Sequence, residues 1–216
     1  MLSEPHLRTI PPEGGKGDRS RRRLLEIAVA RFAAEGYRRT SVSEIARAAD
    51  LTPAAAYAYF AGKEALFVAA VDLDASGLVD HARTVMSETG SDIADQLVET
   101  LTLLIARLPE HPLARRVLAG REPDAIGRLL DLPSLAAFRR EIEARLRSAQ
   151  SEGALRDDVD PAALAAGLET LVLALLMGQV QTGVETSAER AFGVATVLQA
   201  ALRPPSRGAS IATRDA

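Results

Sequence analysis

The stretch "TSVSEIARAADLTPAAAYAYF", residues 40–60, predicts two short helices joined by a tight turn. In the first helix, Ser41 is followed three residues later by Glu44, which is the pattern of a capping box. Thr52 suits the N-cap of the second helix, and Pro53 falls on its first position, where a missing N–H costs nothing. Two helices of about two turns joined in this way form a helix-turn-helix, whose second helix lies in the major groove of DNA.

The second helix carries small side chains, which let its backbone approach the edges of DNA bases. Ala54 and Ala55 can contact thymine methyl groups. Tyr57 and Tyr59 add hydroxyls that can reach phosphates, and Lys63 follows at the start of the next helix, where an anion is also favoured. The alternative is that this alanine-rich helix and its tyrosines only pack within the domain.

The remaining sequence also has the apolar spacing of amphipathic helices, and no run alternates as strands do. We therefore expect an all-α fold of about nine helices. Residues 1–17 are expected to form a flexible lead and 18–78 a DNA-binding domain with its helix-turn-helix at 41–60. A larger helical domain should follow at 79–202, with a disordered tail at 203–216.

The composition argues against several chemistries. The chain has no cysteine, which excludes disulfides, thiolate metal sites and cysteine nucleophiles, and which fits a cytoplasmic setting. Its three histidines are scattered, and no metalloprotease, serine-hydrolase or phosphate-loop pattern occurs. We therefore expect no enzyme activity, no metal and no cofactor.

The longest apolar run is "PAALAAGLETLVLALLMGQVQTGV", Pro161 to Val184, which approaches the length of a membrane span. A buried helix and no membrane contact are expected, because Glu169 lies mid-run and acidic residues precede it. Residues at helical spacing form a seam that suits packing against a partner helix or within one chain. The seam consists of Leu164, Leu168, Leu171, Leu175 and Gly178, and continues with Phe192, Ala195, Gln199 and Leu202 on the final helix.

Aromatic residues are scarce beyond the first third of the chain, where only Phe138 and Phe192 occur. A cavity in the second domain would therefore be mostly aliphatic and suit a lipophilic ligand. Besides Phe138, its candidate residues are Arg107, His111 and Arg121 as polar anchors, although a surface or structural role is favoured for each of the three.

The segment from Arg21 to Val71 resembles the DNA-binding domain of the TetR family of transcriptional regulators. The matching pieces are "F-A-x-x-G-Y" at the end of the first helix, "T-S-V-x-x-I-A" at the start of the second, "Y-x-Y-F" at the close of the third and "K-E-A-L" at the opening of the fourth. Members commonly carry more polar residues in the third helix, so the alanines of this chain shift base reading toward Ser43, Arg47 and DNA shape. The candidate DNA-binding residues are Thr40, Ser43, Arg47, Thr52, Pro53, Ala54, Ala55, Tyr57, Tyr59 and Lys63.

The resemblance also implies that the C-terminal helices form an effector pocket and, from the last two helices of each subunit, a four-helix dimer interface. The expected function is that of a homodimeric regulator, a repressor released from double-stranded operator DNA by a small lipophilic effector. The alternative is an all-α small-molecule-binding or interaction protein whose helix-turn-helix has lost its affinity for DNA.

Overall fold

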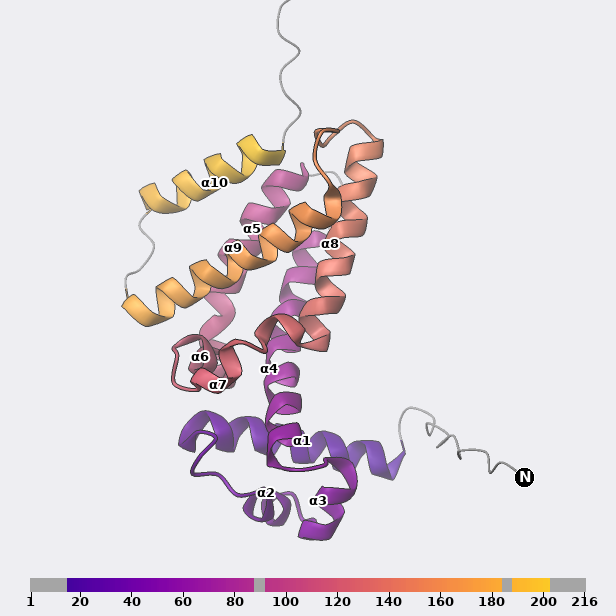
Figure 1. Ribbon diagram of the computed structural model, residues 1–216, viewed down its shortest axis with the longest axis vertical. Helices are drawn as coiled ribbons and strands as arrows, with labels where there is room; N and C mark the ends of the chain where they lie inside the picture. Colours follow the sequence, from indigo (N-terminus) through magenta and orange to yellow (C-terminus); the bar gives the residue numbers. More distant parts are fainter. Residues whose placement is uncertain (1–14, 88–91, 184–187, 203–216) are drawn as a thin grey trace, which may run out of the picture. The chain divides into compact units, whose positions relative to one another are not determined.

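The computed structural model describes residues 15–87, 92–183 and 188–202, and every regular element in these ranges is a helix (Figure 1). The all-α prediction is confirmed. The described residues form ten α-helices and two short 3-10 helices, against about nine helices predicted. The helix α7 (Pro123–Ile126) is a single turn of four residues, too short to produce a periodic pattern in the sequence. The predicted tail, 203–216, and nearly all of the predicted lead lie outside the described residues.

The chain divides into two compact units between Leu73 and Asp74, inside the long helix α4 (Lys63–Met86). The boundary expected from the sequence, at residue 78, falls in the same helix. Because a helix gives no composition change at such a point, the sequence pattern alone cannot place the division within it.

The N-terminal unit contains the first turns of α4 and three further helices. These are α1 (Lys16–Glu35), α2 (Val42–Ala48) and α3 (Pro53–Tyr59). Helix α1 ends where Gly36 takes a φ of 83°, a region that strains other residues. Phe32 of α1 is fully buried and lies edge-on to Phe67 of α4, with ring centroids 5.0 Å apart. Tyr37 meets the same Phe67 ring at 5.1 Å, so an aromatic group fixes the turn after α1 against α4.

The C-terminal unit contains the rest of α4 and six further helices, with α8 packed along α9 and α10 along α5 (Figure 1). These helices are α5 (Ile93–Arg107), α6 (Pro112–Leu118), α7, α8 (Pro133–Ser151), α9 (Pro161–Thr182) and α10 (Ala188–Leu202). One group of buried side chains, here called the Leu146 cluster, joins α5, α8, α9 and α10. It consists of Met86, Ile93, Ala94, Leu97, Ile142, Leu146, Ala149, Leu155, Ala165, Leu168, Leu198 and Leu202.

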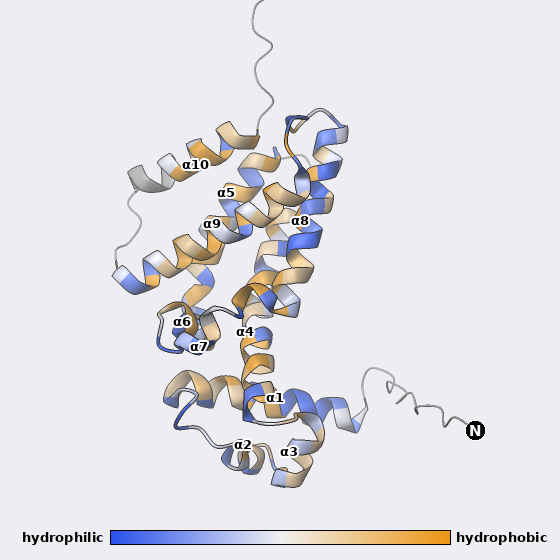
Figure 2. Ribbon diagram, viewed as in Figure 1, coloured by the Kyte–Doolittle hydropathy of each residue, from blue (hydrophilic) through white to orange (hydrophobic). Residues whose placement is uncertain are grey.

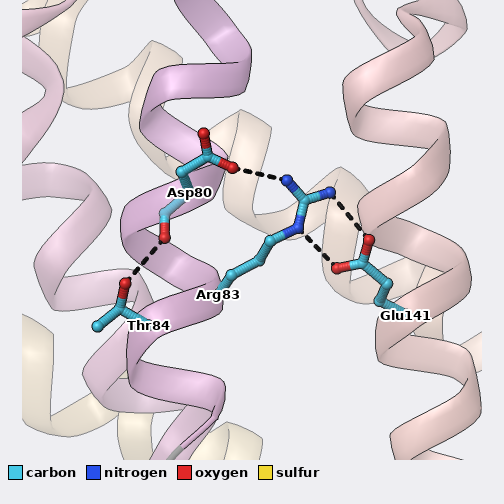
Figure 3. A network of polar contacts seen from close by, with 4 residues as sticks. All are labelled: Asp80, Arg83, Thr84 and Glu141. Atoms are coloured by element: carbon cyan, nitrogen blue, oxygen red, sulfur yellow. Dashed lines mark hydrogen bonds and ion pairs between the residues drawn. The ribbon is translucent and has the colours of Figure 1, made fainter. Parts of the chain in front are cut away.

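Arg83 links α4 to α8 on the surface of this unit. Its Nε and Nη2 donate to the two carboxylate oxygens of Glu141 at 2.8 and 2.9 Å, and its Nη1 donates to Asp80 at 2.7 Å (Figure 3). The hydrogen bonds to Glu141, followed by those to Asp80, raise the pKa of Arg83 above its ordinary value despite partial desolvation. The paired hydrogen bonds give this contact a defined geometry.

Asp74 of α4 caps the start of α6 from inside the unit. Its Oδ2 accepts hydrogen bonds from the backbone N–H groups of Leu113 and Ala114 at 2.9 and 2.8 Å, and its Oδ1 lies 3.4 Å from Nδ1 of His111. Gly77 leaves room for the His111 ring, since a Cβ at Gly77 would stand 2.9 Å from its Cε1. The carboxylate is therefore buried with two backbone hydrogen bonds to one of its oxygens, and it ties α6 to α4.

Helix α9 is strongly apolar, yet a single chain covers little of it. By length and composition it could cross a membrane, and 17% of its most apolar window is buried. Leu171 on α9 is 52% exposed and Val197 on α10 is 64% exposed, and hydrophobic colouring covers much of α9 and of the coloured part of α10 (Figure 2). One chain therefore buries less of α9 than the sequence predicts, which leaves an apolar face open to a partner.

Candidate nucleic-acid interface

The turn between α2 and α3 forms as predicted. Asp50 takes a φ of 58°, a conformation that Asp tolerates better than most residues, and the N–H of Leu51 bonds to the carbonyl of Ala46 at 2.9 Å. The Thr52 hydroxyl accepts from the N–H of Ala55 at 3.2 Å, and Pro53 is the first residue of α3. These contacts confirm the helix-turn-helix, with α3 as its second helix.

The predicted capping box at the start of α2 is wrong. Ser41 occupies the N-cap position, but its side chain makes no capping hydrogen bond. Three of the seven residues in this helix, Val42, Ile45 and Ala46, are buried. Packing of that apolar face therefore positions α2, and the short-range capping pattern is not needed to start it.

Helix α3 has one buried and one open face. Ala56 is fully buried, and Phe60 just after the helix is 6% exposed, which anchors α3 to its own domain. Pro53 and Ala54 are exposed, Ala55 is half-buried, and the Tyr57 side chain is 53% exposed. The open face is thus made of small side chains and one projecting tyrosine, a surface that lets a backbone approach base edges closely.

Two of the predicted DNA contacts have hydrogen-bond partners inside the domain, and a third is partly covered. The Thr40 hydroxyl is buried and donates to the Gly36 carbonyl at 2.8 Å, so its role in the free protein is to hold the turn after α1. Lys63 donates to the Arg38 carbonyl at 3.2 Å. Tyr59 is half-buried, with its hydroxyl 3.8 Å from where a Cβ of Gly17 would stand.

Further residues that could contact DNA lie on α2, where they were predicted, and on α1, where they were not. Arg47 is exposed and Ser43 is half-buried, so both remain available beside α3. The sequence analysis did not single out Arg21 of α1, whose guanidinium lies 5.1 Å from the centre of the Phe60 ring. Arg23 pairs with Asp50 in the turn. The arginine-rich run at 19–23 could have pointed to Arg21 and Arg23 in the sequence, because it places positive charge on α1.

The predicted dimer residues differ in how far their own chain covers them. Leu168 and Leu202 are 5% and 1% exposed and belong to the Leu146 cluster of their own chain, whereas Leu171 and Gly178 lie on the open face of α9. Phe192 is on α10, and its side chain lies outside the described part of the structure. Partly covered positions are Leu164, Leu175, Ala195 and Gln199, the last of which donates to Asp95 at 2.8 Å.

The predicted pocket residues mostly have other roles. Arg107 is exposed and pairs with Glu110 at 2.8 Å, Arg121 is exposed, and Phe138 packs against the Leu146 cluster. His111 lies beside Asp74, and its Nε2 is buried with no hydrogen-bond partner. Buried polar atoms without a partner also occur on Thr100 and Glu169, which sequence reasoning did not select as ligand contacts.

Comparison with known proteins agrees with this geometry. Residues 24–70 match the family of bacterial regulatory proteins described as the tetR family. The uncharacterised HTH-type transcriptional regulator YdgC of Bacillus subtilis (strain 168) is 26% identical over 186 residues, which cover 85% of this chain and 92% of YdgC.

Solved structures share the fold over most of the chain. Salmonella enterica GusR has a TM-score of 0.64 at 26% identity and covers 88% of this chain and 98% of its own. A putative TetR-family transcriptional regulator from Mesorhizobium loti MAFF303099 has a TM-score of 0.67 at 22% identity, with 88% and 99% covered.

The helix-turn-helix, the exposed face of α3 and these likenesses define the class of protein, a DNA-binding transcriptional regulator. Within that class, the chain is similar to the tetR family, whose match covers the helix-turn-helix unit at residues 24–70. Because the matched relatives are regulators and not enzymes, the prediction that the chain is not an enzyme is confirmed.

Proposed function

We propose that this regulator is a homodimeric repressor that binds operator DNA through two copies of α3 and is released by a small apolar effector. The observation that carries the proposal is the open face of α3, where Ala54 and Tyr57 are exposed while Ala56 is buried. A recognition helix held this way can enter the major groove without rearranging its domain. Such a protein acts on chromosomal DNA and therefore works in the cytoplasm.

In this proposal, recognition of the DNA sequence depends on close approach of α3 to the base edges. The exposed alanine of α3 contributes a methyl surface to thymine, Arg47 and Ser43 of α2 supply polar groups, and Tyr57 and Lys63 contact phosphates. Phosphate contacts hold any DNA, whereas the methyl and polar contacts discriminate between sequences. We therefore propose the same DNA-binding residues that the sequence predicted. Thr40 acts indirectly among them, by holding the turn after α1.

Dimerisation is supported by the apolar face that one chain leaves open. Leu171 and Val197 would be covered if α9 and α10 of one protomer packed against the same helices of its partner. Small residues such as Gly178 allow close approach of two helices. A two-fold dimer also places two recognition helices at a fixed spacing, which successive major grooves require.

Release by an effector follows from linkage between two binding sites. A small molecule that binds the C-terminal unit more tightly in the conformation that cannot span two grooves lowers the affinity of the protein for its operator. By linkage, bound operator lowers the affinity for that molecule by the same factor. The aliphatic interior of this unit suits an apolar molecule.

The test is to capture genomic DNA fragments on the purified protein, sequence them, and measure binding to the enriched fragment by fluorescence anisotropy. We expect the enriched fragment to bind at least about a thousandfold more tightly than scrambled DNA at physiological salt. Equal and weak binding to both would contradict the proposal and favour a helical binding protein whose helix-turn-helix has lost its affinity for DNA.

A further inference from the structure

The turn before α3 carries a charge that its backbone does not require. Asp50 takes a φ of 58°, a conformation that Gly, Asn and Asp adopt at lower cost than other residues. Gly or Asn at this position would form the same turn without a charge. The Asp50 side chain is also 75% exposed, so packing does not require it either. The carboxylate therefore has a role other than shaping the turn.

Asp50 forms an ion pair with Arg23 of α1. Nη2 of Arg23 donates to Oδ2 of Asp50, and the Arg23 side chain is 58% exposed. An ion pair this open to water contributes little to stability, because solvent screens it and two long side chains lose freedom when they pair. The effect of the pair is therefore expected in DNA binding rather than in folding.

The first turns of α1 lie along α3. The Tyr59 hydroxyl, at the last residue of α3, lies 3.8 Å from where a Cβ of Gly17 would stand. The Arg21 guanidinium lies 5.1 Å from the centre of the Phe60 ring, which follows the helix. Arg23 reaches the turn at the opposite end of α3. The ion pair thus lies at the N-terminal end of α3, the end that approaches base edges when such a helix enters the major groove.

The helix-turn-helix itself supplies no excess of positive charge. Residues 40–60 contain one basic residue, Arg47, and two acidic residues, Glu44 and Asp50, which gives a formal charge of −1. Attraction to DNA phosphates must therefore come from basic residues that flank this segment, such as the arginines at 21–23. Each of these that is paired within the protein is one fewer charge that can neutralise a phosphate.

We propose that Asp50 holds Arg23 away from the phosphates of DNA and thereby limits the affinity of the protein for DNA of any sequence. Removal of the carboxylate frees the guanidinium, at the N-terminal end of α3, to pair with a phosphate. The effect is independent of base sequence because every DNA carries the same phosphates. Base contacts then have to supply more of the binding. The inference rests on the proposed binding of DNA by α3 and requires neither dimerisation nor an effector.

Asp50→Asn tests the inference, because it removes the charge and keeps a residue suited to the positive φ. Binding of the full chain to random duplex DNA and to the enriched genomic fragment is measured by fluorescence anisotropy at several salt concentrations. We expect both DNAs to bind about fivefold more tightly per protomer at physiological salt, with a slope of log affinity against log salt steeper by about 0.9 per protomer, as for one added phosphate contact. Unchanged or weaker binding, or a gain confined to the genomic fragment, would overturn the inference.

Two further variants separate release of Arg23 from a general effect of charge. In an Arg23→Ala background, Asp50→Asn should give a much smaller gain, because no guanidinium is released. Glu143→Gln is the matched control, since it removes the same charge from an exposed pair with Arg147 in the C-terminal unit and should leave DNA affinity unchanged. Equal gains from Asp50→Asn in both backgrounds, or an equal gain from Glu143→Gln, would overturn the inference.

Asp50→Gly checks that the gain does not depend on the residue introduced. Gly also suits the positive φ, so this variant should reproduce the gain, and both Asp50 variants should melt close to the wild type. Melting far below the wild type in both would show that the carboxylate holds the fold, against the inference. If the wild type binds no DNA, the proposed function fails as well. If the wild type binds DNA and neither Asp50 variant binds more tightly, only this inference fails.

Discussion

The Lys63 ammonium group lies 4.6 Å from the centre of the Tyr37 ring, above the face of an aromatic side chain that itself packs on Phe67. It also donates to the Arg38 carbonyl at 3.2 Å. The charge that we assign to a phosphate contact is therefore positioned in the free protein by the turn after α1. Such positioning reduces the ordering cost of DNA binding, because the lysine is already held.

Lys63→Ala should weaken binding to operator and random DNA alike and reduce the slope of log affinity against log salt by about 1. It should also lower the stability of the N-terminal unit by about 0.5–1 kcal/mol, the usual size of an exposed cation–π contact. Fluorescence anisotropy at several salt concentrations and thermal melting measure the two effects. A loss confined to the operator would show that Lys63 reads sequence and not the backbone.

Ala54→Leu should reduce operator affinity and leave the salt-dependent binding to random DNA nearly intact. The added bulk lies on the open face of α3, so it blocks approach to base edges without disturbing the fold. Leu is nearly as good a helix former as Ala, which removes propensity as a cause. Ala34→Leu, at an exposed position of α1, is the matched control. Equal losses on both DNAs for Ala54→Leu would argue against base reading by this helix.

Leu171→Glu should change the oligomeric state and Leu168→Ala the stability, although both residues belong to the predicted seam. Leu171 is 52% exposed, so the glutamate should produce a folded monomer by placing a charge in the dimer interface. Leu168 is 5% exposed in the Leu146 cluster, so its truncation should cost about 2–5 kcal/mol of stability. Light scattering and denaturant unfolding separate the two results. A wild-type chain that is monomeric at micromolar concentration would remove the dimer hypothesis.

Asp74→Ala should destabilise the C-terminal unit by about 1–3 kcal/mol, because it leaves the N–H groups of Leu113 and Ala114 buried and unpaired. Asp160 provides the comparison, since it is exposed and accepts from the N–H groups of Ala162 and Ala163 at 3.2 and 3.3 Å. Asp160→Ala should cost about 1 kcal/mol or less, because water can replace the exposed carboxylate. Denaturant unfolding followed by circular dichroism measures the free energy of unfolding of both variants. Equal losses would contradict the argument that burial makes the Asp74 cap the more important of the two.

The sequence alone determined the helix-turn-helix, because the interactions that define it are local. Asp50, Thr52 and Pro53 act within three or four residues of themselves through backbone conformation, N-capping and a missing N–H, and all three behave as their residue types predict. Ser41 shows the limit of such reasoning, since a residue that can cap a helix need not do so when packing already positions that helix.

Only the tertiary structure decided how the apolar seam is used and where the buried polar atoms lie. Helix α9 carries apolar residues around most of its circumference, so spacing cannot separate the covered Leu168 from the exposed Leu171. The contact of Arg139 with Glu169 joins residues 30 positions apart on different helices. Burial and pairing of this kind depend on which helices meet, and that is set by the packing of the whole unit rather than by any local pattern.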